Sequence, residues 1–276
     1  MHPDLASRAW VKERLSLLES ESPPRGPALL IYHRVGAGSR DELDVSLSQF
    51  RQQLSALERH DVLPLDTALD RVEARDDRAS VVLTFDDGFA DVYENAWPLL
   101  RERRLPFTLY LATAFMGRRM QWEGSTAQGP HGEGMTWSQI EELVESGLCT
   151  IGNHTHNHLR PEVLTVEDID ECTETVERHL GVSPRHFTYP WGIPVPELEP
   201  DLARRFRSSS TGVLGRNDPQ THSMRLRRVP VRHSDPIEFF EAKLTGRLRA
   251  ERLYAGLVAG AKMPARLSRL LPGRAG

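Results

Sequence analysis

The chain has 276 residues, of which 39% are hydrophobic and 27% charged, a composition typical of a folded globular protein rather than a disordered one. Its formal net charge of −4 at pH 7 argues against a nucleic-acid-binding protein, and its two cysteines, Cys149 and Cys172, are too few for a disulfide framework or a cysteine-based metal cluster. Because the first twenty residues lack the apolar run of a signal peptide and no stretch of about 18 apolar residues occurs, we expect a soluble cytoplasmic protein.

In the first half of the chain, short apolar runs alternate with amphipathic stretches, which is the pattern of β/α units. The run at 80–85 is β-branched and nearly continuous, as expected of a strand buried on both faces. Ser46 and Gln49 form a capping box for the helix that follows them. The elements predicted here are strands at 28–33, 61–65, 80–85 and 107–112, and helices at 46–60, 66–75 and 89–103.

The second half opens on a long Gly-rich segment, 113–135, which is irregular and typical of a functional loop or lid. Beyond it, Thr136 and Gln139 form a second capping box, and Gly181 ends a helix that Thr165 begins. The elements predicted here are helices at 136–146, 165–181 and 197–206, and strands at 148–153, 207–212 and 227–231.

The alternation predicts one α/β domain, residues 26–241, folded as a distorted (β/α) barrel with its active-site loops at the carboxyl ends of the strands. Residues 1–25 are predicted to be an N-terminal helical extension. Residues 242–276 form a basic amphipathic segment with eight Lys or Arg and one acidic residue, Glu251. This segment either packs on the barrel as a helix with a solvated basic face or lies on an anionic membrane.

Two adjacent carboxylates, Asp86 and Asp87, follow the buried strand at 80–85, and Gly88 allows the backbone to turn there. Two anions so close repel each other and raise one pKa unless a cation neutralises one of them. The pair therefore indicates a metal site, with an ordinary β-turn stabilised by aspartate as the alternative.

Three histidines, His154, His156 and His158, follow the strand predicted at 148–153. If this segment forms one turn of helix, the i, i+4 spacing brings His154 and His158 together and turns His156 away. In an extended segment all three would share a face. We favour the 154/158 pair, because Gly152-Asn153 and Pro161 favour a turn that leads into a short helical stretch. Two imidazoles and one carboxylate would leave open positions on zinc for water and substrate.

A third cluster, "RHFTYPWG" at 185–192, completes a series of three motifs. In this order, "TFDDG", "HTHNH" and "RxFxYPWG" resemble the polysaccharide deacetylase family, carbohydrate esterase family 4, whose members share the chitooligosaccharide deacetylase (NodB homology) domain. The resemblance runs from about residue 80 to 192. It implies a (β/α) barrel that lacks part of its staves.

The resemblance also implies roles for individual residues. Asp87, His154 and His158 would bind a divalent metal ion, Zn²⁺ first, with Co²⁺, Ni²⁺ or Fe²⁺ as alternatives. Asp86 would be the general base, and Trp191 would offer its backbone N–H to the oxyanion. By the same resemblance, Thr155 would help to orient the ligands, and Arg185 would hold the base carboxylate.

The general acid is less directly indicated, because the late Asp-Trp and Leu-x-His motifs of many family members are missing after residue 192. "LIYHRV" at the N-terminus resembles the circularly permuted poly-N-acetylglucosamine deacetylase branch, in which these late elements come first. On that basis His33 is the predicted acid, with His233 and His222 as alternatives.

The predicted activity is that of a hydrolase of linear amide bonds that removes acetyl from an acetamido sugar of a polysaccharide or glycan precursor. The alternatives are a deformylase or deacetylase of a lipid-linked amino sugar and a catalytically silent glycan-binding protein of the same fold. The predicted partners are an N-acetylated glycan and, through residues 242–276, the inner face of an anionic membrane, with no nucleic acid.

Overall fold

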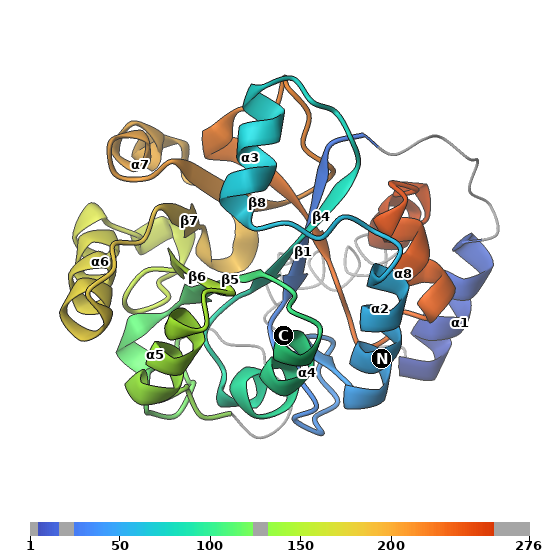
Figure 1. Ribbon diagram of the computed structural model, residues 1–276, viewed down its shortest axis with the longest axis horizontal. Coiled ribbons are helices and arrows are strands. Elements are labelled where there is room, and N and C mark those ends of the chain that lie inside the picture. The colour runs from blue at the N-terminus through green and yellow to red at the C-terminus, as the bar shows by residue number, and fades with distance from the viewer. Residues whose placement is uncertain (1–4, 17–24, 124–131, 257–276) are drawn as a thin grey trace, which may run out of the picture.

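The computed structural model describes residues 5–16, 25–123 and 132–256, and its centre is a closed barrel of parallel strands (Figure 1). The strands follow one another around the barrel in chain order, and the last pairs with the first through Leu30 and Val229. The predicted α/β barrel is therefore confirmed, with seven strands rather than eight. They are β1 (Pro27–Tyr32), β4 (Ser80–Phe85), β5 (Phe107–Leu111), β6 (Cys149–Asn153), β7 (His186–Thr188), β8 (Ser208–Leu214) and β9 (Leu226–Pro230).

Helices cover the outside of the barrel (Figure 1). A small two-stranded sheet, β2 (Arg34–Val35) with β3 (Asp44–Val45), follows β1. Both predicted capping boxes are present, at Ser46 and at Thr136, and Gly181 ends its helix in the left-handed conformation. The helices are α1 (Leu5–Ser16), α2 (Leu47–Leu57), α3 (Leu65–Glu73), α4 (Trp97–Glu102), α5 (Trp137–Glu145), α6 (Val166–Leu180), α7 (Glu199–Arg205) and α8 (Ile237–Leu244).

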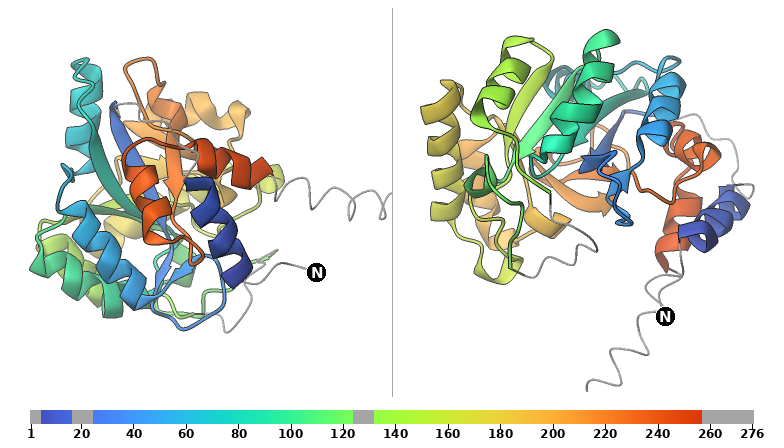
Figure 2. Two further views of the ribbon diagram at one scale, coloured as in Figure 1. Left: turned by 90° about the vertical axis from the view of Figure 1, so that its right-hand side faces the viewer. Right: turned by 90° about the horizontal axis from the view of Figure 1, so that it is seen from below.

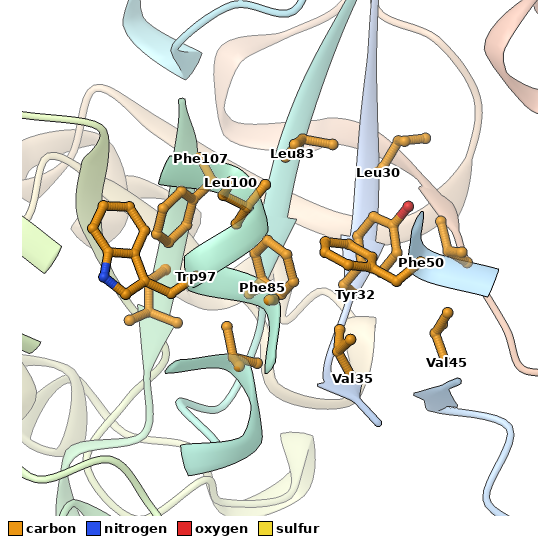
Figure 3. Close-up of a cluster of buried hydrophobic side chains, with 14 of the residues drawn as sticks. Leu30, Tyr32, Val35, Val45, Phe50, Leu83, Phe85, Trp97, Leu100 and Phe107 are labelled. Carbon is orange, nitrogen blue, oxygen red and sulfur yellow. The ribbon is translucent and has the colours of Figure 1, made fainter. Parts of the chain in front are cut away.

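The largest apolar cluster lies between the outer faces of the strands and the helices (Figure 3). At its centre Tyr32 stacks on Phe85 with 5.2 Å between ring centroids, and Phe50 of α2 meets Tyr32 edge-on. Each such aromatic pair adds about 0.5–1.5 kcal/mol to the effect of area burial alone. This cluster fixes β1 against β4, the two strands whose carboxyl ends carry His33 and Asp86.

A second apolar cluster fills the end of the barrel where the strands begin. Leu65 and Leu69 of α3 pack there against Leu29 and Val82. Helix α3 therefore closes this end, which leaves the carboxyl ends of the strands as the open end, where the site was expected.

The helix predicted at 89–103 is present over residues 90–102, but its middle, Val92–Ala96, is π-helical, because Pro98 has no amide to continue the regular ladder and the Trp97 amide bonds to Val92 O instead. One local prediction needs correction. The strand predicted at 61–65 is reduced to one bridge between Val62 and Val81, since α3 already begins at Leu65. The described part of the segment 113–135 contains a single 3-10 turn, Thr113–Phe115, and isolated bridges, and residues 124–131 lie outside the described residues.

Helix α1 lies beside α8 (Figure 2), and buried charges join it to the C-terminal part of the chain. Lys12 lies 2.6 Å from Asp235, and Lys243 lies 2.7 Å from Asp235 and 3.0 Å from Glu251. The predicted boundary between residues 241 and 242 falls inside α8, and residues 257–276 of the basic segment lie outside the described residues. Within the described part of the chain, no helix is long and apolar enough to cross a membrane.

Candidate metal centre

The two carboxylates stand in a tight turn at the carboxyl end of β4. Asp87 has a left-handed backbone, with φ at 75°, and Gly88 follows with φ at 95°. A Cβ on Gly88 would lie 2.9 Å from side-chain atoms of both Leu111 and Met116, so the close packing under the turn also requires glycine. The sequence predicted that Gly88 allows the turn, and the structure adds that Asp87 itself adopts the left-handed conformation, which an Asp tolerates better than most residues.

The histidine segment is a bent loop after β6 and not the predicted turn of helix. Thr155 and His158 both have left-handed φ values, 68° and 52°, which a helix excludes. The predicted pair is nevertheless formed, since the rings of His154 and His158 lie 4.9 Å apart. His156 points away, as predicted, and its Nδ1 contacts the hydroxyl of Thr113.

Three buried side chains converge at this end of the barrel. Asp87 Oδ1 lies 3.2 Å from His154 Nε2 and 3.4 Å from His158 Nε2, and one ligand atom from each residue lies within 4.8 Å of the others. Ligand atoms bound at about 2.0–2.1 Å to one tetrahedral ion are about 3.3 Å apart, so these spacings fit a shared cation. Asp87 Oδ1 is also buried without a hydrogen-bond partner among the described residues, as expected of an atom whose lone pair binds a metal.

The pKa shifts of Asp87 and His158 suit metal ligands, whereas burial lowers the pKa of His154 but the carboxylates of Asp87 and Asp86 outweigh burial and raise it. Burial by itself raises the pKa of Asp87, but the imidazoles of His154 and His158 beside it outweigh burial and hold the pKa well below its usual range. Burial lowers the pKa of His158, which favours the neutral ring. His154 donates Nδ1–H to Thr188 O at 2.8 Å, which leaves its Nε2 lone pair directed at the site.

Asp86 is held by a different residue from the one predicted. Arg228 of β9 lies 2.7 Å from Asp86 Oδ1 inside the barrel and also donates to Thr211 O. Burial tends to raise the pKa of Asp86, but the positive charge of Arg228 outweighs burial, and the pKa lies below its ordinary value.

The prediction that Arg185 holds the base is wrong. Arg185 precedes β7, at the opposite end of the barrel from Asp86, and it is exposed and bonded to Asp66 at 3.1 Å. No sequence motif indicated Arg228, because its contact with Asp86 joins residues 142 positions apart. Only the inward alternation of β9 could have indicated it.

The three candidate acids occupy different places. His33 follows β1 directly, and because Tyr32 pairs with Phe85, His33 lies beside Asp86. His222 is exposed and precedes β9, which places it at the opposite end of the barrel. His233 follows β9, but its Nδ1 contacts Asp44 O at 2.7 Å.

Two tryptophans flank His158. The ring of Trp122 lies 4.2 Å from it and that of Trp191 lies 5.4 Å from it. Trp191 is half-buried and has a left-handed backbone, with φ at 63°. Such conformations in non-glycine residues cluster at functional sites. Thr155, as the resemblance implied, contacts the ligand segment, since its hydroxyl accepts a hydrogen bond from the His158 amide at 3.1 Å.

Comparisons with known proteins agree with this geometry. The family model described as "Polysaccharide deacetylase" matches residues 73–202. The poly-beta-1,6-N-acetyl-D-glucosamine N-deacetylase of Staphylococcus aureus is 25% identical over 165 residues, which cover 54% of this chain and 54% of that protein. The chain therefore spans about half the length of the curated relatives it matches.

Solved structures give the same result over more of the chain. The structure of IcaB from Ammonifex degensii has a TM-score of 0.69 and 30% identity and covers 81% of this chain and 98% of its own. The Streptococcus pyogenes deacetylase PplD, in complex with acetate, has a TM-score of 0.64 at 22% identity, covers 77% of this chain and 94% of its own, and supports the fold alone.

Proposed function

The chain belongs to the polysaccharide deacetylase family, and on this premise we propose that it is a metal-dependent carbohydrate N-deacetylase that hydrolyses an acetamido group to acetate and a free amino sugar. The observation that carries the proposal is the arrangement of Asp86. This carboxylate is buried beside the triad of Asp87, His154 and His158, and Arg228 keeps it ionised. A base next to a metal site is the machinery that amide hydrolysis needs.

In the proposed reaction, Asp86 takes a proton from the attacking water as the water oxygen bonds to the acetyl carbon. A cation held by Asp87, His154 and His158 would polarise the acetyl carbonyl and lower the pKa of water at the site. The backbone N–H of Trp191 donates to the oxyanion that forms, and donors fixed in this way stabilise the transition state.

The C–N bond then breaks, and the leaving nitrogen needs a proton. We propose that His33 donates it, because this ring lies beside Asp86 at the end of β1. Its Nδ1 is buried and has no hydrogen-bond partner among the described residues, so the ring has a polar atom free to act. We propose Zn²⁺ as the metal, since two His and one carboxylate are a common catalytic zinc set.

For the substrate we propose a polymer or precursor containing N-acetylglucosamine. The support is the similarity to proteins named poly-beta-1,6-N-acetyl-D-glucosamine N-deacetylase. Trp122 and Trp191, which flank His158, provide aromatic surfaces of the kind on which sugar rings stack.

We further propose that the basic segment 242–276 contacts an anionic membrane from the cytoplasmic side through residues 257–276, since Lys243 and Glu251 in its first part are buried. The support is charge: residues 257–276 contain Lys262, Arg266, Arg269 and Arg274 and no acidic residue. Each basic residue near an anionic leaflet contributes about 1 kcal/mol. A chain ending at Gly256, which keeps the buried Glu251, should lose binding to phosphatidylserine-containing vesicles and keep its activity on a soluble sugar. Unchanged vesicle binding would reject this contact.

The activity is tested by measuring acetate release from a β-1,6-linked N-acetylglucosamine oligomer. Asp86→Asn should abolish release with bound metal unchanged, whereas Asp87→Asn should lose both. A chelator should stop the wild type, and added Zn²⁺ should restore it. Normal release by Asp86→Asn would contradict the role of this base, and oligomer binding without release by the metal-loaded wild type would identify a glycan-binding protein instead.

A further inference from the structure

We propose that Asp168 is a positioning residue that sets the metal affinity of the triad by holding the loop that carries His158. Asp168 lies in the first turn of α6, which packs beside this loop, and it is 5% exposed. The inference rests on the metal site of the proposed function, and it concerns a residue outside all three sequence motifs.

Hydrogen bonds join Asp168 to the middle of the histidine loop. Its Oδ1 accepts from the side-chain Nδ2 of Asn157 at 2.7 Å and from the Asn157 amide at 3.1 Å. Its main-chain oxygen accepts from the His156 amide at 3.0 Å. Hydrogen bonds to an ionised acceptor are roughly twice as strong as neutral ones, so this carboxylate is a firm anchor.

The site of Asp168 suits a buried charge. Thr165 caps α6 and accepts from the Asp168 amide at 3.3 Å, so the carboxylate stands at the positive end of the helix dipole. Together with the two Asn157 contacts, this environment stabilises a carboxylate that contacts no cationic side chain among the described residues.

The strongest reason for the inference is the way His158 is held. His154 has a hydrogen bond from Nδ1 to Thr188 O, whereas Nδ1 of His158 is buried without a partner among the described residues. The orientation of His158 therefore depends on its backbone, at a left-handed φ of 52°, and on the flanking tryptophans. That backbone conformation is strained, and strained conformations persist only where their surroundings enforce them.

Helix α6 also anchors the start of the loop. Asn153 donates from its side chain to Ile169 O and Thr173 Oγ1, and its Oδ1 accepts from the Thr155 amide at 2.8 Å. Asn153 fixes the loop directly before His154, and the contact of Asp168 with Asn157 fixes it directly before His158. The backbone is therefore held next to both ligands. Loss of the Asp168 anchor would free His158 and leave His154 in place.

The test is the dissociation constant for Zn²⁺, measured by competition with a chromophoric chelator on the full chain. Asp168→Ala should weaken binding by about tenfold or more, the usual effect of losing a residue that orients a metal ligand. Asp168→Asn should weaken binding less than Asp168→Ala, because an amide oxygen still accepts both bonds from Asn157 but without the negative charge that strengthens them. Asn157→Asp should weaken binding strongly, because it sets two carboxylates against each other.

Two controls on the same helix separate positioning from general stability. Asp170→Ala removes a surface carboxylate that pairs with Arg205, and Gly181→Ala strains the left-handed backbone at the opposite end of α6. Both should leave the Zn²⁺ constant unchanged. With Co²⁺ in the site, the visible absorption spectrum should change in Asp168→Ala and stay as in the wild type in both controls.

The inference is overturned if Asp168→Ala and Asn157→Asp bind Zn²⁺ as the wild type does, or if the controls weaken binding equally. If Asp168→Ala does not fold, Asn157→Ala and Asn157→Asp provide the same comparison. A wild type that binds Zn²⁺ but releases no acetate defeats the proposed activity alone, and an active wild type with an unaffected Asp168→Ala constant defeats this inference alone. A wild type that binds no Zn²⁺ overturns both.

Discussion

Replacing Arg228 with methionine tests the central feature of the site, the buried pair between Arg228 and Asp86. Asp86 is 2% exposed and Arg228 is 1% exposed, and 2.7 Å separates their nearest atoms, so solvent does not screen the pair. Removing one partner of such a pair leaves an uncompensated charge and costs about 3–5 kcal/mol. Without the arginine the pKa of Asp86 rises. Proton uptake by Asp86 then avoids part of this cost, but it removes the base.

Arg228→Met should therefore unfold at lower urea concentration and release acetate about 10²-fold more slowly or worse, since general base catalysis contributes about 10²–10⁴-fold. The acidic limb of its pH–rate profile should move to higher pH, a change that simple loss of stability would not cause. Arg228→Lys should be intermediate, because a lysine keeps the charge but cannot reach both Asp86 and Thr211 O with a planar fork.

The matched control is Arg185→Gln, at the residue that the family resemblance had indicated. Because Arg185 is exposed and bonds to Asp66 at the other end of the barrel, this variant should keep full activity. Loss of activity in Arg185→Gln with a normal Arg228→Met would refute the assignment of Arg228.

Three further predictions concern metal and stability. Zn²⁺ at 100 times its dissociation constant should raise the free energy of unfolding by about 2.7 kcal/mol, an increase that Asp87→Asn should lack in a thermal melt. Burial tends to raise the pKa of Asp235, but the buried lysines beside it, Lys243 first, lower it to about 2. This pKa is below the unfolded value of about 3.9, so the ionised Asp235 stabilises the fold above about pH 4. Its contribution to the free energy of unfolding is lost as the pH falls toward 2. Urea titrations of Asp235→Asn should accordingly show lower stability at pH 7 and a weaker pH dependence between pH 4 and 2. Gly88→Ala should cost about 1–3 kcal/mol in urea titration, because it strains a left-handed backbone and presses on Met116; an unchanged midpoint would contradict that turn.

Sequence alone predicted what depends on local patterns. The capping boxes at Ser46 and Thr136 and the glycine end at Gly181 need only neighbouring residues, and all three are present. The barrel follows from the alternation of strands and helices. The grouping of Asp87 with the two histidines follows because the carboxyl ends of parallel strands meet at one end of a barrel.

Sequence could not predict what depends on distant contacts. The helical spacing of His154 and His158 suggested a helix, but α6 holds this segment in a bent loop through Asn153 and Asp168. Arg228 is one of many arginines in the chain, and its role appears only once the closed barrel places β9 across from the end of β4. The prediction failed where tertiary contacts override a local preference.

The adjacent carboxylates can have separate roles because the barrel directs them to different partners. Asp86 continues the inward alternation of β4 and meets Arg228, a fixed cation that leaves one oxygen of the carboxylate for proton transfer. Asp87 leaves the strand through a left-handed turn and lies beside two histidines. The three side chains together form a ligand set for a cation. Two groups of the same kind acquire different chemistry when their environments differ. Because both side chains are aspartates, the division between base and metal ligand follows from the partner that each one meets, Arg228 or the two histidines, and not from the residue type.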